Sequence, residues 1–359
     1  MKMSSLRTLT ATLIFGFSMV ASFTFAQSAV FNPDDAIVTY NPAQPPTQPA
    51  SGPGKWVRTS RMPWTTSSFK CYIYKGIAFR LKYPKTFKDV VPGDGKKFPL
   101  FLFFHGAGEK GTIYDNEYQL YHGGNKHMLA VDNGSYDGVL LYPQCTNTVF
   151  SFSELVIINE LIEQYLIPEV RVDPFRISVD GLSGGGKSSW NMMTYFPKLT
   201  AGVAPISSSE YSIIPYIKAN KFTPIWLFQG ALDNEPPVSR TRVLVDSAKA
   251  FGANFTYTEF PDRGHDSWYN AWAEPGYFPF LASVHKANPW PLNGRYEFCP
   301  GEPVNQVIGV GDGFDEYQWR KNGNIISGAT SNTITATTLG TYDCRIRRDT
   351  VWSVWSPVP

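Results

Sequence analysis

The chain has 359 residues, which is enough for one large and one small domain. Its 32 basic and 30 acidic residues leave a formal net charge of +2 at pH 7, which argues against a nucleic-acid-binding surface. Aromatic residues make up 15% and charged residues only 17%, a balance that favours neutral or carbohydrate-like partners over polyanions.

The N-terminus has the pattern of a secretory signal peptide over residues 1–26. Lys2 and Arg7 precede an uncharged apolar run at 9–25, and small residues end at Ala26, where we expect cleavage. A membrane anchor is the alternative, but the run is short for a membrane span and polar, proline-rich chain follows it. We therefore expect a secreted, periplasmic or extracellular protein with no stable membrane association.

Residues 27–63 are rich in proline and predict an extended lead-in segment. Strand and helix signals alternate from residue 64 to residue 291, which predicts an α/β domain with a doubly wound, mostly parallel sheet. The expected strands are short apolar runs at 98–104, 138–142, 175–180, 202–206, 224–228 and 255–260. The expected helices are 153–166, 188–196 and 239–251, and a serine is available to cap the first and the last.

The segment 181–188 fits two catalytic patterns. Its first five residues form the G-x-S-x-G nucleophile elbow, and all eight form the G-x-x-x-x-G-K-S loop that cradles phosphates. A phosphate loop also needs a magnesium-holding aspartate at the end of a second apolar strand, and none of the predicted strands supplies it cleanly. Export and this missing partner favour the elbow, so Ser183 is the candidate nucleophile and Lys187 a solvated lysine at the helix start.

A serine nucleophile needs a base and an acid that orients the base. In the elbow fold these follow in the order serine, acid, histidine. His265 follows the last predicted strand directly, and Asp233 lies on the loop that leaves the strand 224–228. Glu210 is the alternative acid. We therefore predict Ser183, Asp233 and His265 as the catalytic set.

The other histidines and the oxyanion donors complete the site. His285 is expected to be structural, whereas His122 and His127 lie in a long loop that could border the site but precede the serine. The oxyanion donors are predicted to be the backbone N–H groups of Gly184 and Ala107, the latter in the glycine-rich loop 105–109.

Five motifs, taken in their order and spacing, resemble those of secreted α/β-hydrolases of the esterase and poly(3-hydroxybutyrate) depolymerase-like group. They lie at residues 105–109, 142–145, 181–185, 230–233 and 264–268. That group includes feruloyl and acetylxylan esterases, and the resemblance covers about residues 70–290. It implies the same triad and oxyanion donors, with no metal or organic cofactor. Trp268 and His105 are expected to contact substrate. One departure is the extra Gly186 before Lys187, which predicts a looser helix start.

The resemblance implies a secreted serine carboxylic-ester hydrolase acting on ester side groups of plant polysaccharide or on a related ester polymer. The expected partners are a small-molecule or polysaccharide ester, no nucleic acid, and no second copy of the chain. Two alternatives remain open: a serine peptidase of prolyl-peptidase type, and a non-catalytic polysaccharide-binding or adhesion protein.

The C-terminal segment 292–359 carries Cys299, Trp319, Tyr342 and Cys344 in a Cys…Trp…Tyr-x-Cys arrangement. It resembles the small immunoglobulin-like modules of exported bacterial enzymes, although it is short enough for edge strands to be missing. The resemblance implies a Cys299–Cys344 disulfide in an oxidising compartment. Three questions stay open: whether the remaining two cysteines, Cys71 and Cys145, pair, whether the module is a spacer or a glycan binder, and whether the natural chain continues beyond residue 359.

Overall fold

The structure is a computed structural model, and it describes residues 30–91 and 93–359. The signal peptide expected at 1–26 lies outside the described residues. Within the described ranges, no helix combines the length and the apolar character that crossing a membrane requires.

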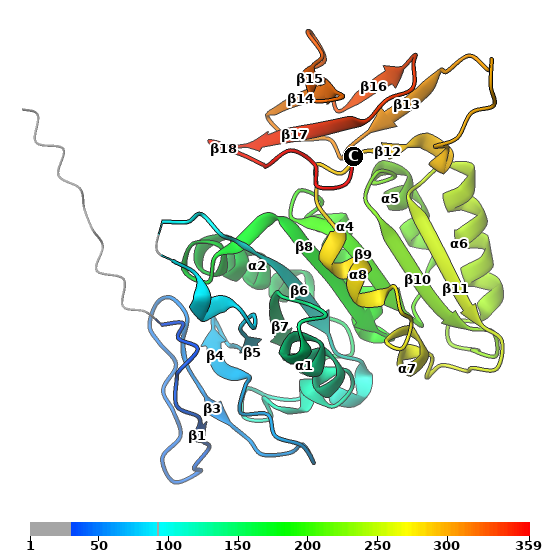
Figure 1. Cartoon of the computed structure of the whole chain (residues 1–359). Coiled ribbons are helices and arrows are strands. Elements are labelled where there is room, and N and C mark those ends of the chain that lie inside the picture. Colours follow the sequence, from blue (N-terminus) through cyan, green and yellow to red (C-terminus); the bar gives the residue numbers. More distant parts are fainter. Residues whose placement is uncertain (1–29, 92) are drawn as a thin grey trace, which may run out of the picture.

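The larger part of the chain is built on a nine-stranded sheet with the order β11-β10-β9-β8-β6-β7-β5-β4-β2 (Figure 1). Neighbouring strands from β11 to β7 are parallel, and β5, β4 and β2 extend the sheet in antiparallel pairing. The strands are β2 (Gly54–Lys55), β4 (Lys70–Tyr74), β5 (Ile77–Lys82), β6 (Phe98–Phe104), β7 (Val139–Pro143), β8 (Val172–Leu182), β9 (Thr200–Ile206), β10 (Ile225–Gly230) and β11 (Phe255–Phe260). The mostly parallel sheet expected from the sequence is present.

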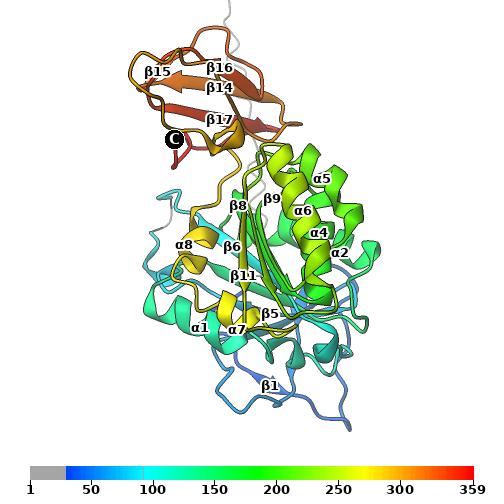
Figure 2. The ribbon, with the colours of Figure 1, turned by 90° about the vertical axis from the view of Figure 1, so that its right-hand side faces the viewer.

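The central strands are buried on both faces, which explains their continuous apolar runs. In β6, Leu100 and Leu102 face one hydrophobic core, while Phe101 and Phe103 face the other. Helices cover both faces (Figure 2). The first face packs against α2 (Phe152–Leu161), α4 (Gly184–Tyr195), α5 (Ile214–Ala219) and α6 (Val238–Ala250), and the second against α1 (Gly124–Asn133), α7 (Trp268–Ala271) and α8 (Tyr277–Ser283).

Helix starts differ from the sequence-based expectation in three places, the first being α4, which begins at Gly184 rather than at residue 188. Ser151 caps α2 in a capping box with Glu154, and beyond Leu161 the chain continues through a π-helical turn (Ile162–Leu166) into the short α3 (Ile167–Glu169). The prediction of a serine cap for α6 is wrong. Extended Pro237 precedes the helix, and Ser239 lies inside its first turn.

The proline-rich segment before residue 64 packs against the sheet. Its strands β1 (Val38–Thr39) and β3 (Val57–Arg58) pair with each other, and β2 joins the edge of the main sheet. Trp56 is buried with Ile73, and its indole N–H donates to the Ile113 carbonyl at 2.8 Å. The lead-in is therefore part of the large unit, because its aromatic residues are buried there.

The C-terminal chain forms two antiparallel sheets, with the orders β12-β13-β16 and β15-β14-β17-β18. Buried Trp319 pairs with Cys344 across β14 and β17, and the Tyr342 hydroxyl donates to the Thr338 carbonyl at 2.9 Å. Such a tyrosine contact occurs in immunoglobulin-like sandwiches. The strands are β12 (Trp290–Pro291), β13 (Gln306–Gly309), β14 (Glu316–Lys321), β15 (Asn324–Ile325), β16 (Thr333–Ala336), β17 (Tyr342–Arg348) and β18 (Val351–Trp352).

The cysteine pairing implied for this unit is wrong, because all four cysteines are free. Cys299 is exposed in the segment that precedes β13, outside both sheets, whereas Cys344 is buried in β17. Ile308, from β13 of the opposite sheet, packs against the core around Cys344. A bridge requires the two Cα atoms to approach within about 7 Å, and the residue that packs toward Cys344 from the facing sheet is Ile308 rather than Cys299.

The two units share one hydrophobic cluster. Phe175, near the amino end of β8, and Ala287 are buried together with Val310 and Trp319 of the C-terminal unit. Gly309 also lies against the ring of Phe222, which precedes β10; a Cβ there would lie 2.4 Å from that ring. The C-terminal unit therefore sits on the amino-terminal edge of the main sheet, and the carboxyl ends of the parallel strands face away from it (Figure 2).

Candidate active site

A sharp turn joins β8 to α4 and carries Ser183. Its backbone has φ 54° and ψ −116°, in the sparsely populated region of positive φ. A Cβ at Gly181 would lie 2.3 Å from the Gly185 carbonyl oxygen, and one at Gly185 would lie 2.0 Å from the Phe104 carbonyl oxygen. Only glycine fits at either position, so the G-x-S-x-G pattern has a steric cause here.

The structure brings the three predicted triad residues together. His265 Nε2 lies 2.8 Å from Ser183 Oγ, and His265 Nδ1 lies 3.0 Å from Asp233 Oδ2. With the Nδ1 proton donated to the carboxylate, Nε2 is left to accept the serine proton. The residues come from the end of β8, the loop after β10 and the loop after β11, all at the carboxyl edge of the sheet.

Asp233 is held by two donors in addition to His265. The Gln229 side-chain amide donates to Oδ2 at 2.6 Å, and the Glu235 backbone N–H donates to Oδ1 at 2.8 Å. Gln229 was not predicted as a site residue, although a polar residue in the apolar strand β10 is a signal for one. The His265 carbonyl accepts from the Ser207 hydroxyl at 2.7 Å, which fixes the histidine backbone.

The pKa of His265 is raised, first by its hydrogen bond to Asp233 and then by nearby carboxylates, of which Asp233 is the strongest; partial burial opposes the shift. A base with a raised pKa binds the serine proton more strongly in the transition state.

The alternative residues do not join this group. Glu210 forms an ion pair with Lys187 at 2.7 Å, so the alternative acid is paired with the helix-start lysine that we expected to be solvated. Burial lowers the pKa of His127 to about 3 and that of His285 to about 4. Neither is placed to accept the serine proton.

The loop after β6 borders the nucleophile. Gly106 packs against Leu182, where a Cβ would lie 2.5 Å from the leucine side chain. Ala107 begins the short 3₁₀ turn (Ala107–Glu109), and Gly184 is the first residue of α4. Within residues 30–91 and 93–359, the N–H groups of Ala107 and Gly184 have no hydrogen-bond acceptor. They fit the predicted oxyanion donors, because unpaired N–H groups are free to donate hydrogen bonds to a substrate oxygen.

The expectation of substrate contact by His105 is wrong. Its ring is only 1% exposed, Nδ1 donates to the Gly106 carbonyl at 2.8 Å, and Nε2 accepts from the Cys145 N–H at 3.2 Å. Burial lowers the pKa of His105, in keeping with a neutral ring that fixes the loop. Trp268 is also largely buried and lies edge-on to His265, with ring centroids 5.8 Å apart.

The remaining two cysteines stay separate. Cys145 is buried beside His105, and burial raises its thiol pKa to about 12. Cys71 is buried beside Arg80, and burial also raises its thiol pKa. Both thiols are free, so Cys71 and Cys145 do not form a disulfide.

A cavity of about 270 Å³ opens beside Ser183. Most of its lining is polar, including Thr148, Ser208, Lys187 and Arg240. The described residues contain no cluster of three or more histidine, cysteine, aspartate or glutamate side chains placed to hold a metal ion. The site offers a nucleophile, a base and two N–H donors, the set that acyl transfer requires.

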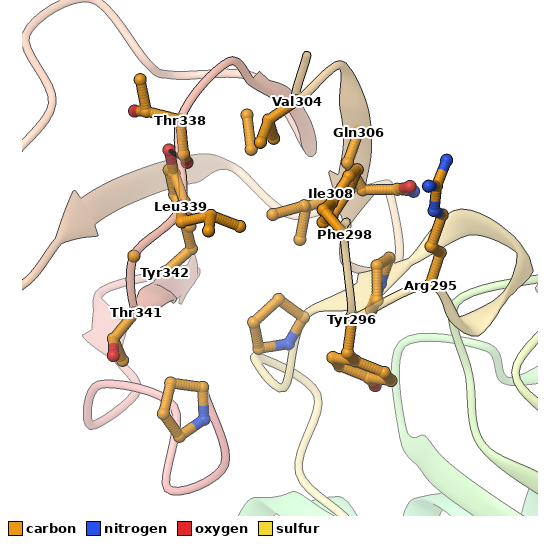
Figure 3. A pocket seen from close by; sticks show the side chains of 15 residues that line it. Arg295, Tyr296, Phe298, Val304, Gln306, Ile308, Thr338, Leu339, Thr341 and Tyr342 are labelled. Carbon is orange, nitrogen blue, oxygen red and sulfur yellow. Dashed lines mark hydrogen bonds between the residues drawn. The ribbon is translucent and has the colours of Figure 1, made fainter. Parts of the chain in front are cut away.

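A second cavity, of about 230 Å³, lies in the C-terminal unit (Figure 3). Tyr296, Phe298, Leu339 and Arg295 line it, and no member of the triad does. It is therefore separate from the candidate active site.

Comparisons with known proteins gave no matching family model and no matching curated protein. Among solved structures, one described as a thermostable esterase is 29% identical with a TM-score of 0.52, and the match covers 61% of this chain and 63% of that protein. The match thus spans less than two thirds of that protein. A ferulic acid esterase (18% identity, TM-score 0.48, 60% of this chain and 96% of that one) and an acylaminoacyl peptidase from Pyrococcus horikoshii (15%, 0.44, 57% and 39%) are less similar. The first likeness supports the α/β-hydrolase fold.

Proposed function

We propose that this α/β-hydrolase is a secreted serine ester hydrolase. The observation that carries the proposal is the continuous hydrogen-bond chain from Ser183 Oγ through His265 to Asp233, set on a strained strand-to-helix turn. This geometry recurs on unrelated folds that use a serine as an acyl-transfer nucleophile.

In the proposed mechanism Ser183 Oγ attacks the ester carbonyl carbon while His265 Nε2 takes the hydroxyl proton. The Gly184 and Ala107 N–H groups stabilise the tetrahedral oxyanion. His265 then donates the proton to the alcohol oxygen, the C–O bond breaks, and an acyl-enzyme remains. Water, deprotonated by His265, releases the acid and restores Ser183.

The proposed substrates are ester side groups of a plant polysaccharide, feruloyl or acetyl, or a related ester polymer. The polar lining of the cavity beside Ser183 suits a hydroxyl-rich substrate better than a long alkyl chain. The similar thermostable esterase supports ester over amide hydrolysis. The C-terminal unit is proposed to be an immunoglobulin-like sandwich, which its buried Trp319 and its Tyr342 contact support.

Ser183→Ala tests the proposal. The variant should lose at least about 10⁴-fold in kcat on 4-nitrophenyl acetate, because the nucleophile is gone, and it should unfold at the wild-type temperature. Ser135→Ala, an exposed serine in the turn after α1, is the control and should keep full activity. Activity retained in Ser183→Ala would show that another residue attacks the ester. Faster hydrolysis of a matched anilide than of the ester would show that the protein is a peptidase and not an esterase.

A further inference from the structure

A pocket of about 280 Å³ opens between the start of α1 and α7, and neither the sequence motifs nor the triad accounts for it. Figure 2 shows these helices near each other at the end of the sheet away from the C-terminal unit. We call it the tyrosine pocket and define it by Tyr121, Asn125, Lys126, Tyr269 and Trp272, which line it with Gly123 and Leu129.

The two tyrosines of this pocket are exposed. Tyr121 is 53% and Tyr269 is 56% exposed, while Trp272 forms a buried floor. Edge-to-face contacts hold the rings: Tyr269 lies 5.8 Å from Trp272, and Tyr121 lies 4.7 Å from His122, measured between ring centroids. Adjacent, fixed and exposed aromatic rings are typical of a binding surface.

His122 and Trp268 connect the tyrosine pocket to the triad. The ring of His122 lies 6.0 Å from Tyr269 and 5.3 Å from Trp268, which in turn contacts His265. His122 Nδ1 bonds to the buried carboxylate of Glu109 at 2.5 Å. In the part of the chain that the structure describes, His122 Nε2 has no partner, so it can bond a hydroxyl of a ligand lying between the pocket and Ser183.

We propose that the tyrosine pocket binds a sugar unit of the polysaccharide whose ester group reaches Ser183. A pyranose ring has an apolar face of C–H groups, which packs on an aromatic ring, and a rim of hydroxyls, which need polar partners. Tyr121 and Tyr269 supply the rings, Asn125 and Lys126 of the lining supply polar partners, and His122 beside the pocket supplies another. The pocket lies two ring contacts away from His265, so its occupant belongs to a substrate larger than a simple alkyl ester.

This inference rests on the proposed esterase function. The experiment therefore distinguishes failure of the sugar site from failure of the esterase function. We would measure kcat/KM of wild type and of Tyr121→Ala/Tyr269→Ala on acetylated xylan and on 4-nitrophenyl acetate. The ratio of the polymer value to the small-ester value should fall about tenfold or more in the double variant, through a higher KM for the polymer. Xylohexaose binding, measured by calorimetry on the same proteins, should weaken by a similar factor.

Tyr296→Ala is the matched control, since Tyr296 is an exposed tyrosine that lines the cavity of the C-terminal unit in Figure 3. It should leave both the ratio and xylohexaose binding unchanged. An unchanged ratio in the double variant, an equal loss on both substrates, or a loss caused by Tyr296→Ala instead would each overturn the tyrosine pocket as a sugar site. If the wild type hydrolyses neither ester, the proposed function fails. Calorimetry with xylohexaose alone then tests whether the tyrosine pocket binds sugar.

Discussion

Asp233 is a nearly buried carboxylate whose two oxygens share three donors: His265, the Gln229 amide and the Glu235 N–H. A carboxylate held in this way keeps one orientation, because donors on both of its oxygens fix the plane of the group. It therefore holds the His265 ring in one tautomer, and it also raises the pKa of that ring. His265 acts as a base only when it is neutral, so activity should fall as the pH drops through this raised pKa.

Asp233→Asn should show both effects. Loss of the carboxylate lowers the pKa of His265, so the acid limb of the kcat/KM profile should move to lower pH, while kcat falls about 10⁴-fold. The measurement is a pH profile on 4-nitrophenyl acetate from pH 4 to pH 9. Asp262→Asn, an exposed carboxylate close to His265 in sequence, should reproduce the wild-type profile. An acid limb that stays in place or moves to higher pH would contradict the assignment.

At the scale of elements, the strand-to-helix turn depends on the carbonyl groups that end β6. Gly185 lies so close to the Phe104 and His105 carbonyl oxygens that a Cβ would come within 2.0 Å and 2.6 Å of them. Backbone atoms cannot rotate away as a side chain can. A methyl group at Gly185 would therefore have to displace either β6 or α4.

Gly185→Ala should accordingly destabilise the protein by about 3 kcal/mol, the upper part of the range for overpacking. This corresponds to a fall of about 5–10 °C in the unfolding midpoint of a unit of this size, measurable by circular dichroism. Gly108→Ala is a suitable comparison, because a Cβ at Gly108 meets no atom within 4 Å. Equal midpoints for the two variants would show that the close approach is absent in solution.

The elements that could be predicted were those whose signal is local. The run 98–104 is apolar throughout because β6 is buried on both faces, and the glycines around Ser183 reflect a steric need within five residues. The structure differs from the sequence-based expectation where contacts with distant parts of the chain determine whether a residue is buried. Trp56 is buried because β2 pairs with β4, and His105 is enclosed because Cys145 approaches it from the loop after β7. Neither contact leaves a trace in the neighbouring sequence.

The same division applies to the candidate site. Ser183, Asp233 and His265 could be placed together because each follows a strand of one parallel sheet, and such strands end at one edge. The tyrosine pocket could not be predicted as a unit, because Tyr121, which precedes α1, and Tyr269, which lies in α7, are far apart in the chain. Cys299 and Cys344 had the expected spacing, but spacing says nothing about whether Cys299 lies in a strand.

At the scale of the whole molecule, the two units are joined by a shared core as well as by the chain. Phe175 of the large unit is buried against the C-terminal unit, and the ammonium group of buried Lys286 lies 6.0 Å from the Phe314 ring centroid. Burial lowers the pKa of Lys286 to about 8, and its Nζ donates to the Pro197 and Thr200 carbonyls. Units that bury each other's side chains should unfold together.

We therefore expect one calorimetric transition for the wild type. Phe175→Ala should remove about 3 kcal/mol or more from the shared core and separate a C-terminal transition from the main one, about 10 °C or more below it. Phe152→Ala, an exposed phenylalanine at the start of α2, should keep the single transition. Two transitions in the wild type would mean that the shared cluster does not couple the units.

The placement of the C-terminal unit at the amino-terminal edge of the sheet has a practical consequence for immobilisation. The triad and the tyrosine pocket lie at the opposite edge, beyond the full length of the strands. A bead or surface attached through the C-terminal unit would thus hold the protein with its candidate active site turned outward. The support would then not block the approach of a bulky polymer to the triad.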